Sequence, residues 1–160
     1  QLSAGDLVIP KSVSDAKDNI FRTDRELHEK ISGHFSNKIK LSSGRLFGSE
    51  TIIWDAEEKK RVLKRYNTET VDMESLGVAQ AAIENKCSFL IVRAISDTAK
   101  QNLPKHTLKS FNLNNSIKIS SILIDLAKNP NEIPSLLELV QNIQKAHKCL
   151  QNVAKLGFGI

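Results

Sequence analysis

Apolar residues in the first two thirds of the chain occur in short runs that are separated by helical patterns. Strands are predicted over residues 5–11, 38–48, 68–73 and 87–96, and helices over residues 23–32, 55–66 and 74–86. The run over 87–96 is almost wholly apolar, which is typical of a strand covered on both faces. Strands and helices in this order predict an α/β layer with parallel strand pairing and right-handed crossovers.

Two of the predicted helices begin with capping signals. Thr23 is followed three residues later by Glu26, and Asp55 is followed at the same spacing by Glu58. At this spacing a cap and an acid satisfy free N–H groups in the first turn of a helix. The sequence therefore predicts that Thr23 and Asp55 cap their helices.

The C-terminal part of the chain is predicted to be helical. One helix is expected over residues 116–129, ending at Pro130, and a last helix begins near Glu132. A spacing of three and four gives the last helix one apolar face, formed by Ile133, Leu136, Leu137, Val140, Ile143, Leu150 and Val153. Docking on the domain or contact with another subunit is the favoured use of this face, and a membrane surface is the alternative. We expect an α/β domain over residues 1–129 and an amphipathic helical extension over residues 130–160.

Two carboxylates come directly after predicted strands. Glu74 follows the strand over 68–73, and Asp97 follows the strand over 87–96. Ligands of such sheets bind beyond the carboxyl ends of the strands, and burying a carboxylate is costly unless something binds it. We therefore expect Glu74 and Asp97 to face one crevice.

The surroundings of the two acids suggest different roles. The carboxylate of Glu74 is suited to accept hydrogen bonds from a ribose diol, and Met73 offers a polarizable surface for a sugar or base. Asp97, with Ser96 and Arg93 nearby, is suited to protonate a purine at N7 while an oxocarbenium-like sugar forms. The alternatives are that Glu74 is only a helix-start acid and that Asp97 only caps the following loop.

Composition narrows the classes of function. The chain has 160 residues, of which 40% are hydrophobic and 26% charged, and it has no apolar run of the roughly 20 residues that span a bilayer. Membrane association is not expected. The formal net charge of +5 arises partly from the cationic segment 57–65, which we expect to face water on a helix. Because only 5% of the residues are aromatic, nucleic acid is not an expected partner.

The cysteines and histidines give further expectations. Cys87 and Cys149 are isolated thiols, which indicate a reducing compartment and hence a cytoplasmic location. The four histidines are not spaced as metal ligands, and no metal site is predicted. The chain does not begin with Met, which suggests a trimmed or partial chain.

Two motifs resemble the signature of the purine nucleoside phosphorylase superfamily. They are VDMES at residues 71–75 and FLIVRAISD at residues 89–97, with the small residues AQAA on the helix between them. The resemblance is to the methylthioadenosine/S-adenosylhomocysteine nucleosidase branch. More narrowly, LFGSETI at 46–52 and LAKNPNEIPSLLELVQNIQKAHKCL at 126–150 resemble the hopanoid-associated phosphorylase-like proteins, which are thought to remove adenine from adenosylhopane.

The resemblance implies a three-layer α/β fold with a mixed, largely parallel sheet and C-terminal helices. It covers only the C-terminal two thirds of the family fold, so that the N-terminal strands and their Gly-rich turn are missing. By the resemblance, Glu74 corresponds to the acid that holds the ribose diol, Met73 packs on the nucleoside, and Asp97 protonates the base. Ser96 supports Asp97, and Arg93 lies close behind.

One departure from the family concerns base recognition. Family nucleosidases present an aromatic residue to the purine from the loop that matches GSETII, where this chain has Thr51 and Ile52. The resemblance therefore implies that Thr51 and Ile52 contact the substrate without an aromatic stack. Phe47 and Trp54 are the residues nearby that could replace it.

Two hypotheses of function follow. The first is cleavage of the N-glycosidic bond of an adenosine-type nucleoside by water or phosphate, without a metal or organic cofactor and with phosphate at most as a co-substrate. The second is a non-catalytic or partner-dependent piece of the same fold that binds nucleoside or oligomerises. Under both, a homo-oligomer or a partner chain with the missing strands is expected. A basic nucleic-acid or membrane-surface module ranks last.

Overall fold

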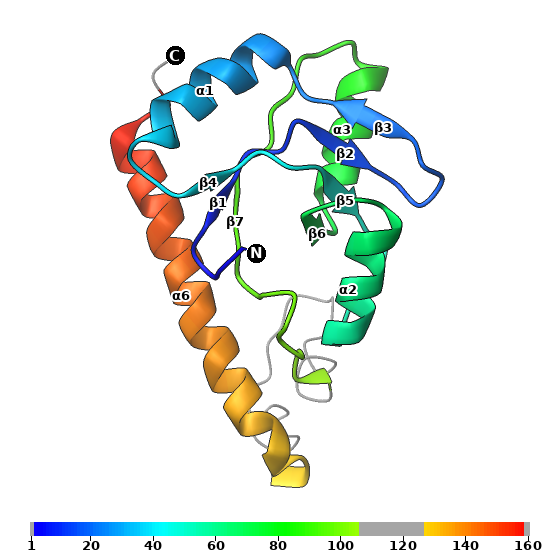
Figure 1. Cartoon of the computed structure of the whole chain (residues 1–160), viewed down its shortest axis with the longest axis vertical. Helices are drawn as coiled ribbons and strands as arrows, with labels where there is room; N and C mark the ends of the chain where they lie inside the picture. The colour runs from blue at the N-terminus through cyan, green and yellow to red at the C-terminus, as the bar shows by residue number, and fades with distance from the viewer. Residues whose placement is uncertain (1, 106–126, 159–160) are drawn as a thin grey trace.

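A computed structural model describes residues 2–105 and 127–158, and Figure 1 shows how their elements are arranged. The strands are β1 (Leu7–Val8), β2 (Ser12–Ser14), β3 (Ile20–Arg22), β4 (Leu41–Ser42), β5 (Leu46–Gly48), β6 (Thr70–Asp72) and β7 (Arg93–Ala94). The helices are α1 (Arg25–Ser36), α2 (Ala56–Arg65), α3 (Ser75–Glu84), the 3-10 turn η1 (Pro130–Glu132) and α6 (Ile133–Leu156). Most of the helix expected over 116–129 lies outside the described residues.

The described strands form two small sheets of mixed direction. One sheet has the order β4-β1-β7, and the other has the order β3-β2-β5-β6. The pairs β1–β4, β2–β5 and β5–β6 are parallel, whereas β1–β7 and β2–β3 are antiparallel. The predicted mixed, largely parallel α/β fold is therefore confirmed.

Two of the predicted strands are divided between the sheets. The strand expected over 5–11 is shorter, and β2 follows it in the other sheet. The strand expected over 38–48 is β4 and β5, with residues 43–45 outside both ladders. Pro10 lies at the corresponding point of the first strand, and a proline nitrogen cannot donate to a ladder. The chain thus passes from one sheet to the other twice, between β1 and β2 and between β4 and β5, and these strands pair with each other in both sheets.

The apolar run over 87–96 is a strand only at β7, so the strand length and the parallel pairing expected there were wrong. Leu7 pairs with Ala94 and Val8 with Arg93 in antiparallel register. The side chains nevertheless alternate between two clusters: Phe89 belongs to one, and the partly buried Leu90 packs against the other. Burial on both sides, which the sequence indicated, does not require a continuous hydrogen-bonded ladder.

The predicted cap of α2 is confirmed, and that of α1 is wrong by one residue. The Asp55 carboxylate accepts a hydrogen bond from the Glu58 N–H at 2.7 Å. For α1 the cap is Asp24, which accepts from the Leu27 N–H at 2.8 Å. The Thr23 hydroxyl instead donates to main-chain carbonyls of residues 10 and 11, which ties the start of α1 to the segment between β1 and β2.

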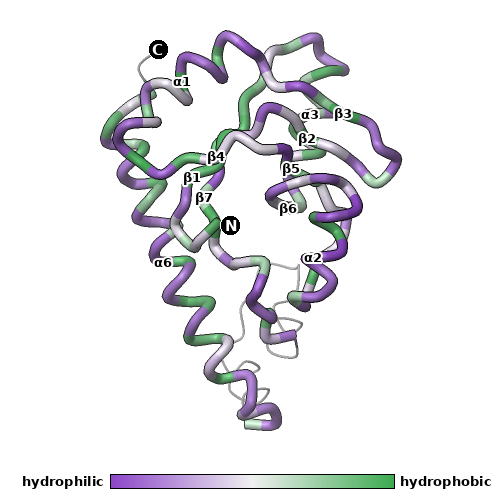
Figure 2. The backbone as a smooth tube through the Cα atoms, viewed as in Figure 1, coloured by the Kyte–Doolittle hydropathy of each residue, from purple (hydrophilic) through white to green (hydrophobic). Residues whose placement is uncertain are grey.

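The helix α6 has two apolar sides, although the sequence analysis described one. The buried side is formed by Leu139, Asn142, Ala146, Cys149 and Val153. Most of the residues assigned to the single apolar face are exposed, namely Ile133, Leu137, Val140, Ile143 and Leu150. Apolar residues thus recur along the whole length of the helix (Figure 2). No helix in the described ranges is both long and apolar enough to cross a membrane.

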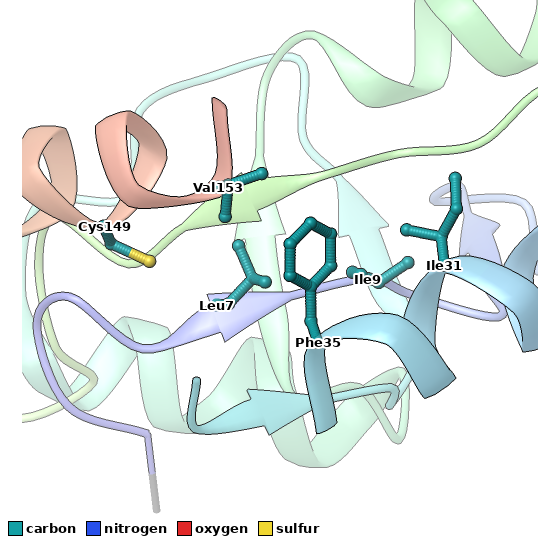
Figure 3. Close-up of a cluster of buried hydrophobic side chains, with 6 residues drawn as sticks. All are labelled: Leu7, Ile9, Ile31, Phe35, Cys149 and Val153. Atoms are coloured by element: carbon teal, nitrogen blue, oxygen red, sulfur yellow. The ribbon is translucent and has the colours of Figure 1, made fainter. Parts of the chain in front are cut away.

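A hydrophobic core joins α1 and α6 to the first strand (Figure 3). Its buried residues are Leu7, Ile9, Ile31, Phe35, Cys149 and Val153. A second cluster packs α3 on β2 and β5 through Val13, Leu46, Ala79, Phe89 and Ile91. The helical extension thus shares a core with the N-terminal strands, while the division of domains at residue 130 stays a prediction.

The two thiols are expected to differ strongly in reactivity. Cys87 is exposed and Cys149 is buried. Burial, and to a lesser extent the charge of Asp6, raises the pKa of the Cys149 thiol, so less of the reactive thiolate is present. At pH 8 a disulfide reagent such as Ellman's should modify Cys87 about 100-fold faster than Cys149, which reacts only after local opening. In 8 M urea, taken as the control, both should react alike; equal rates without urea would contradict the buried position.

Candidate functional site

A cavity of about 1140 Å³ opens beyond the ends of β6 and β7. All seven residues that the sequence analysis assigned to a site line it: Thr51, Ile52, Met73, Glu74, Arg93, Ser96 and Asp97. Glu74 and Asp97 follow the strands β6 and β7 by two and three residues. The two acids therefore open into one shared cavity, as the strand-end argument predicted.

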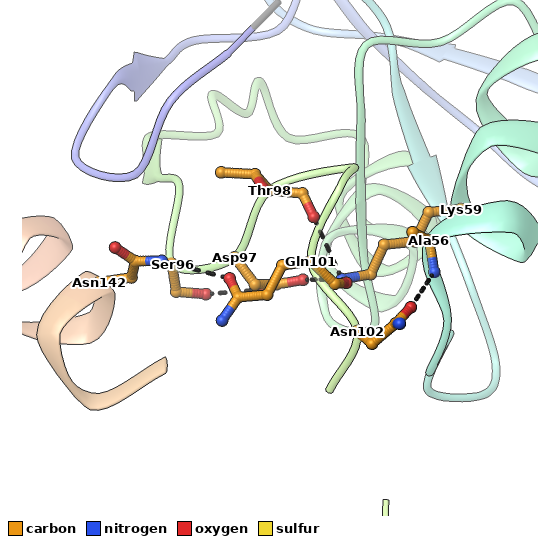
Figure 4. A network of polar contacts seen from close by, with 8 residues as sticks. All are labelled: Ala56, Lys59, Ser96, Asp97, Thr98, Gln101, Asn102 and Asn142. Carbon is orange, nitrogen blue, oxygen red and sulfur yellow. Dashed lines mark hydrogen bonds and ion pairs between the residues drawn. The ribbon is translucent and has the colours of Figure 1, made fainter. Parts of the chain in front are cut away.

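Asp97 is held by a lysine that the sequence analysis did not single out (Figure 4). The ammonium of Lys59 lies 2.6 Å from Oδ2 of Asp97, and the Ser96 hydroxyl donates to Oδ1 at 3.1 Å. The same ammonium donates to the carbonyls of Thr98 at 3.3 Å and Gln101 at 2.9 Å. Each carboxylate oxygen of Asp97 thus has one fixed neighbour, and the chain after Asp97 is fastened to α2.

The burial of Lys59 corrects the expectation that the cationic segment 57–65 faces water throughout. Only 9% of its side chain is exposed, because the ammonium has acceptors for each of its three N–H groups. A signal for this was present in the sequence. Lys59 lies on the same side of α2 as Val62, Leu63 and Tyr66, which are partly buried, so a helical repeat through those positions includes it.

Glu74 is bound by Arg93, which also reaches Asp72. Nη2 of Arg93 lies 2.9 Å from Oε2 of Glu74, and Nε lies 3.3 Å from Oδ2 of Asp72. The Glu74 side chain is 66% exposed, which leaves its other oxygen open to the cavity. Arg93, on β7 of the other sheet, therefore fixes the direction of the Glu74 carboxylate.

The contacts of Glu74 do not support the alternative that this residue only starts the helix α3. Asp72 performs that role: its carboxylate accepts from the Ser75 N–H at 3.0 Å and from the Ser75 hydroxyl. Glu74 occupies the position before the first helical residue but makes no side-chain capping bond. Its carboxylate is thus free of a capping role, and within the described residues its ion-pair partner is Arg93.

The loop that contains Thr51 and Ile52 brings no aromatic ring to the cavity. Both residues are exposed at its edge. Phe47 is buried and stacks on Tyr66, with ring centroids 4.0 Å apart. Neither Phe47 nor Trp54 lines the cavity, and within the described residues its lining includes no aromatic side chain.

The described part of the chain offers no grouping for a metal ion. No cluster of three or more histidine, cysteine or acidic side chains occurs there. Carboxylates such as those of Glu74 and Asp97, which line the cavity, can accept hydrogen bonds from hydroxyl groups and exchange protons.

Comparison with known proteins gives a consistent family relation. A family model described as the phosphorylase superfamily matches residues 1–128. A DeoD-type purine nucleoside phosphorylase from Buchnera aphidicola subsp. Acyrthosiphon pisum is 35% identical over 89 residues, covering 54% of this chain and 38% of the relative. A 5′-methylthioadenosine/S-adenosylhomocysteine nucleosidase from Buchnera aphidicola subsp. Schizaphis graminum is 26% identical over 154 residues, covering 82% of this chain and 65% of the relative.

A solved structure shows the same fold. The 5′-methylthioadenosine/S-adenosylhomocysteine nucleosidase from Colwellia psychrerythraea, in complex with adenine, is similar with a TM-score of 0.54 at 20% identity. The match covers 88% of this chain and 61% of that one. The chain therefore spans less than two thirds of the length of each of these three proteins.

Proposed function

The chain belongs to the phosphorylase superfamily, and on that premise we propose that it cleaves the N-glycosidic bond of an adenosine-type purine nucleoside. The observation that carries this proposal is that Glu74 and Asp97, which come from different strand ends, line the same cavity. A diol-binding carboxylate and an acid for the base are the two groups that such a cleavage requires from the protein.

In this proposal the two acids act on opposite parts of the nucleoside. Glu74 accepts hydrogen bonds from the ribose hydroxyls, and Arg93 holds it in place through the 2.9 Å ion pair. Asp97 gives a proton to N7 of the base as the bond to the sugar breaks, and Ser96 supports it. Met73 packs on the nucleoside, and Thr51 and Ile52 border the base at the edge of the cavity.

The attacking group is water or phosphate, and no organic cofactor takes part in the proposal. We infer a cytoplasmic enzyme, in agreement with the isolated thiols. The resemblance to hopanoid-associated phosphorylase-like proteins in the segments 46–52 and 126–150 remains the finer prediction of substrate. A nucleoside with a large apolar 5′ group is the class that it suggests.

A second candidate is a partner-dependent or non-catalytic domain that binds nucleoside or self-associates. Two observations favour it: the cavity has no aromatic lining in the described residues, and α6 exposes the apolar residues Ile133, Leu137, Val140, Ile143 and Leu150. Exposed apolar rows of this length are typical of contact surfaces. We propose a second copy of this chain as the partner.

One experiment separates the two candidates. The purified 160-residue chain is incubated with adenosine and 5′-methylthioadenosine, with and without phosphate, and base release is followed while light scattering measures its mass. Base release supports the enzyme, and dependence on phosphate identifies the attacking group. A dimer that binds adenine without releasing base from either nucleoside supports the second candidate. A chain that neither binds adenine nor releases base contradicts both.

A further inference from the structure

The buried Lys59 ammonium is arranged to control the orientation of Asp97. It is tetrahedral, and its three donors are directed to Oδ2 of Asp97 at 2.6 Å, to the Gln101 carbonyl at 2.9 Å and to the Thr98 carbonyl at 3.3 Å. A lysine that only neutralised the surface would be exposed. Here the side chain is buried although Lys59 is one of the residues that line the cavity, and its ammonium meets the carboxylate from the side of α2.

The loop that contains Asp97 is held in place on both sides. The Asn102 side chain accepts from the Ala56 N–H at 2.8 Å, and the Asn142 amide of α6 donates to the Gln101 side chain at 3.2 Å. Figure 4 shows these contacts around Lys59. The position of the loop therefore does not depend on Lys59 alone, whereas Oδ2 of Asp97 is held by Lys59 and Oδ1 by the Ser96 hydroxyl.

We infer that Lys59 is a positioning residue that keeps Oδ2 of Asp97 as an acceptor, because an ammonium can only donate, so that Oδ1 carries the proton given to the base; the Ser96 hydroxyl at Oδ1 can rotate and accept. This inference rests on the proposed function. In the step, the C1′–N9 bond breaks with its electron pair going to the base, the proton moves from Oδ1 to N7, and the oxygen of the attacking water joins C1′. The proton that this water loses restores Asp97, so the sum is nucleoside and water to base and ribose.

The test compares two substrates that differ in their need for a proton. Adenosine requires protonation of its base, whereas the nitrophenolate of 4-nitrophenyl β-ribofuranoside leaves without it. Lys59→Met should lower kcat for adenosine by about 100-fold, the scale of a misplaced catalytic group, and leave kcat for the nitrophenyl riboside within about 3-fold. Lys59→Arg keeps the charge, but its planar fork does not match three tetrahedral acceptors, so the same selective loss is expected in a variant that stays folded.

Lys148→Met is the matched control, since Lys148 is exposed on α6 and does not line the cavity. It should leave both substrates unaffected. Equal losses on both substrates in the folded Lys59→Arg variant, or no loss on either, would overturn the positioning role while the proposed function stands. A wild-type chain that cleaves neither substrate would instead overturn the proposed function, and this inference with it.

Discussion

Asp97→Asn should reduce purine release from adenosine-type nucleosides by about 10²–10⁴-fold, the usual contribution of a general acid. Asparagine has nearly the shape of aspartate: its amide oxygen can accept from Lys59, and its NH2 group can donate to the Ser96 hydroxyl oxygen, so the cavity should keep its form. What it lacks is a transferable proton. The measurement is single-turnover base release at pH 7, with adenine affinity by calorimetry as the second reading. The affinity for adenine should change much less than the rate of base release.

A matched control for this substitution is Asp18→Asn. Asp18 lies outside the cavity, and its 3.5 Å pair with Arg65 is solvent-exposed, so it contributes little to stability. Its backbone has a φ of 62°, a conformation that asparagine adopts readily. The control should therefore fold and react like the unaltered chain. If Asp97→Asn kept full activity, proton transfer by Asp97 would be refuted, whatever its contacts with Lys59.

The joint position of the two acids could be predicted from the sequence because it depends on a rule of sheet geometry. In an α/β layer, residues just past successive strands are expected to border one crevice. Glu74 and Asp97 line one cavity, although β6 and β7 belong to different sheets and β7 has only two residues. The exact length of a strand was not needed for that argument. The same argument could not predict the direction in which β7 pairs, because an apolar run indicates burial and not a pattern of hydrogen bonds.

The partners of the acids were harder to predict. Lys59 is one of several cations in the segment 57–65, and only its place in the helical repeat with Val62 and Tyr66 distinguishes it from Lys60, which is exposed. Its burial depends on carbonyls that lie about 40 residues away, in the segment 98–101. The repeat could indicate that Lys59 is buried, but it could not indicate which distant acceptors the ammonium binds. The division of apolar residues on α6 between a buried and an exposed side had the same cause, since it is set by where β1 and α1 lie.

Phe35→Ala should lower the free energy of unfolding by about 3–5 kcal/mol, the range for removing a buried phenylalanine. The ring is fully buried in the cluster that joins α1 to β1 and α6. Its removal leaves a cavity between three elements that are far apart in the sequence, and little of it can close without moving a helix. A domain of this size has about 5–15 kcal/mol of stability in total, so the loss is a large fraction. Urea unfolding followed by circular dichroism measures it.

Phe158→Ala is the matched control, because it deletes the same side chain at a neighbouring site. The two rings are in edge-to-face contact with centroids 6.0 Å apart, but Phe158 is 38% exposed. Its loss should cost about 1 kcal/mol, the value of one aromatic pair and a partly buried ring. Since Cys149 and Val153 belong to the same cluster as Phe35, the Phe35→Ala chain should also expose Cys149 to thiol reagents. A small change in stability together with an unreactive Cys149 would mean that α6 is held by other contacts, and that the C-terminal helix is stable independently of α1.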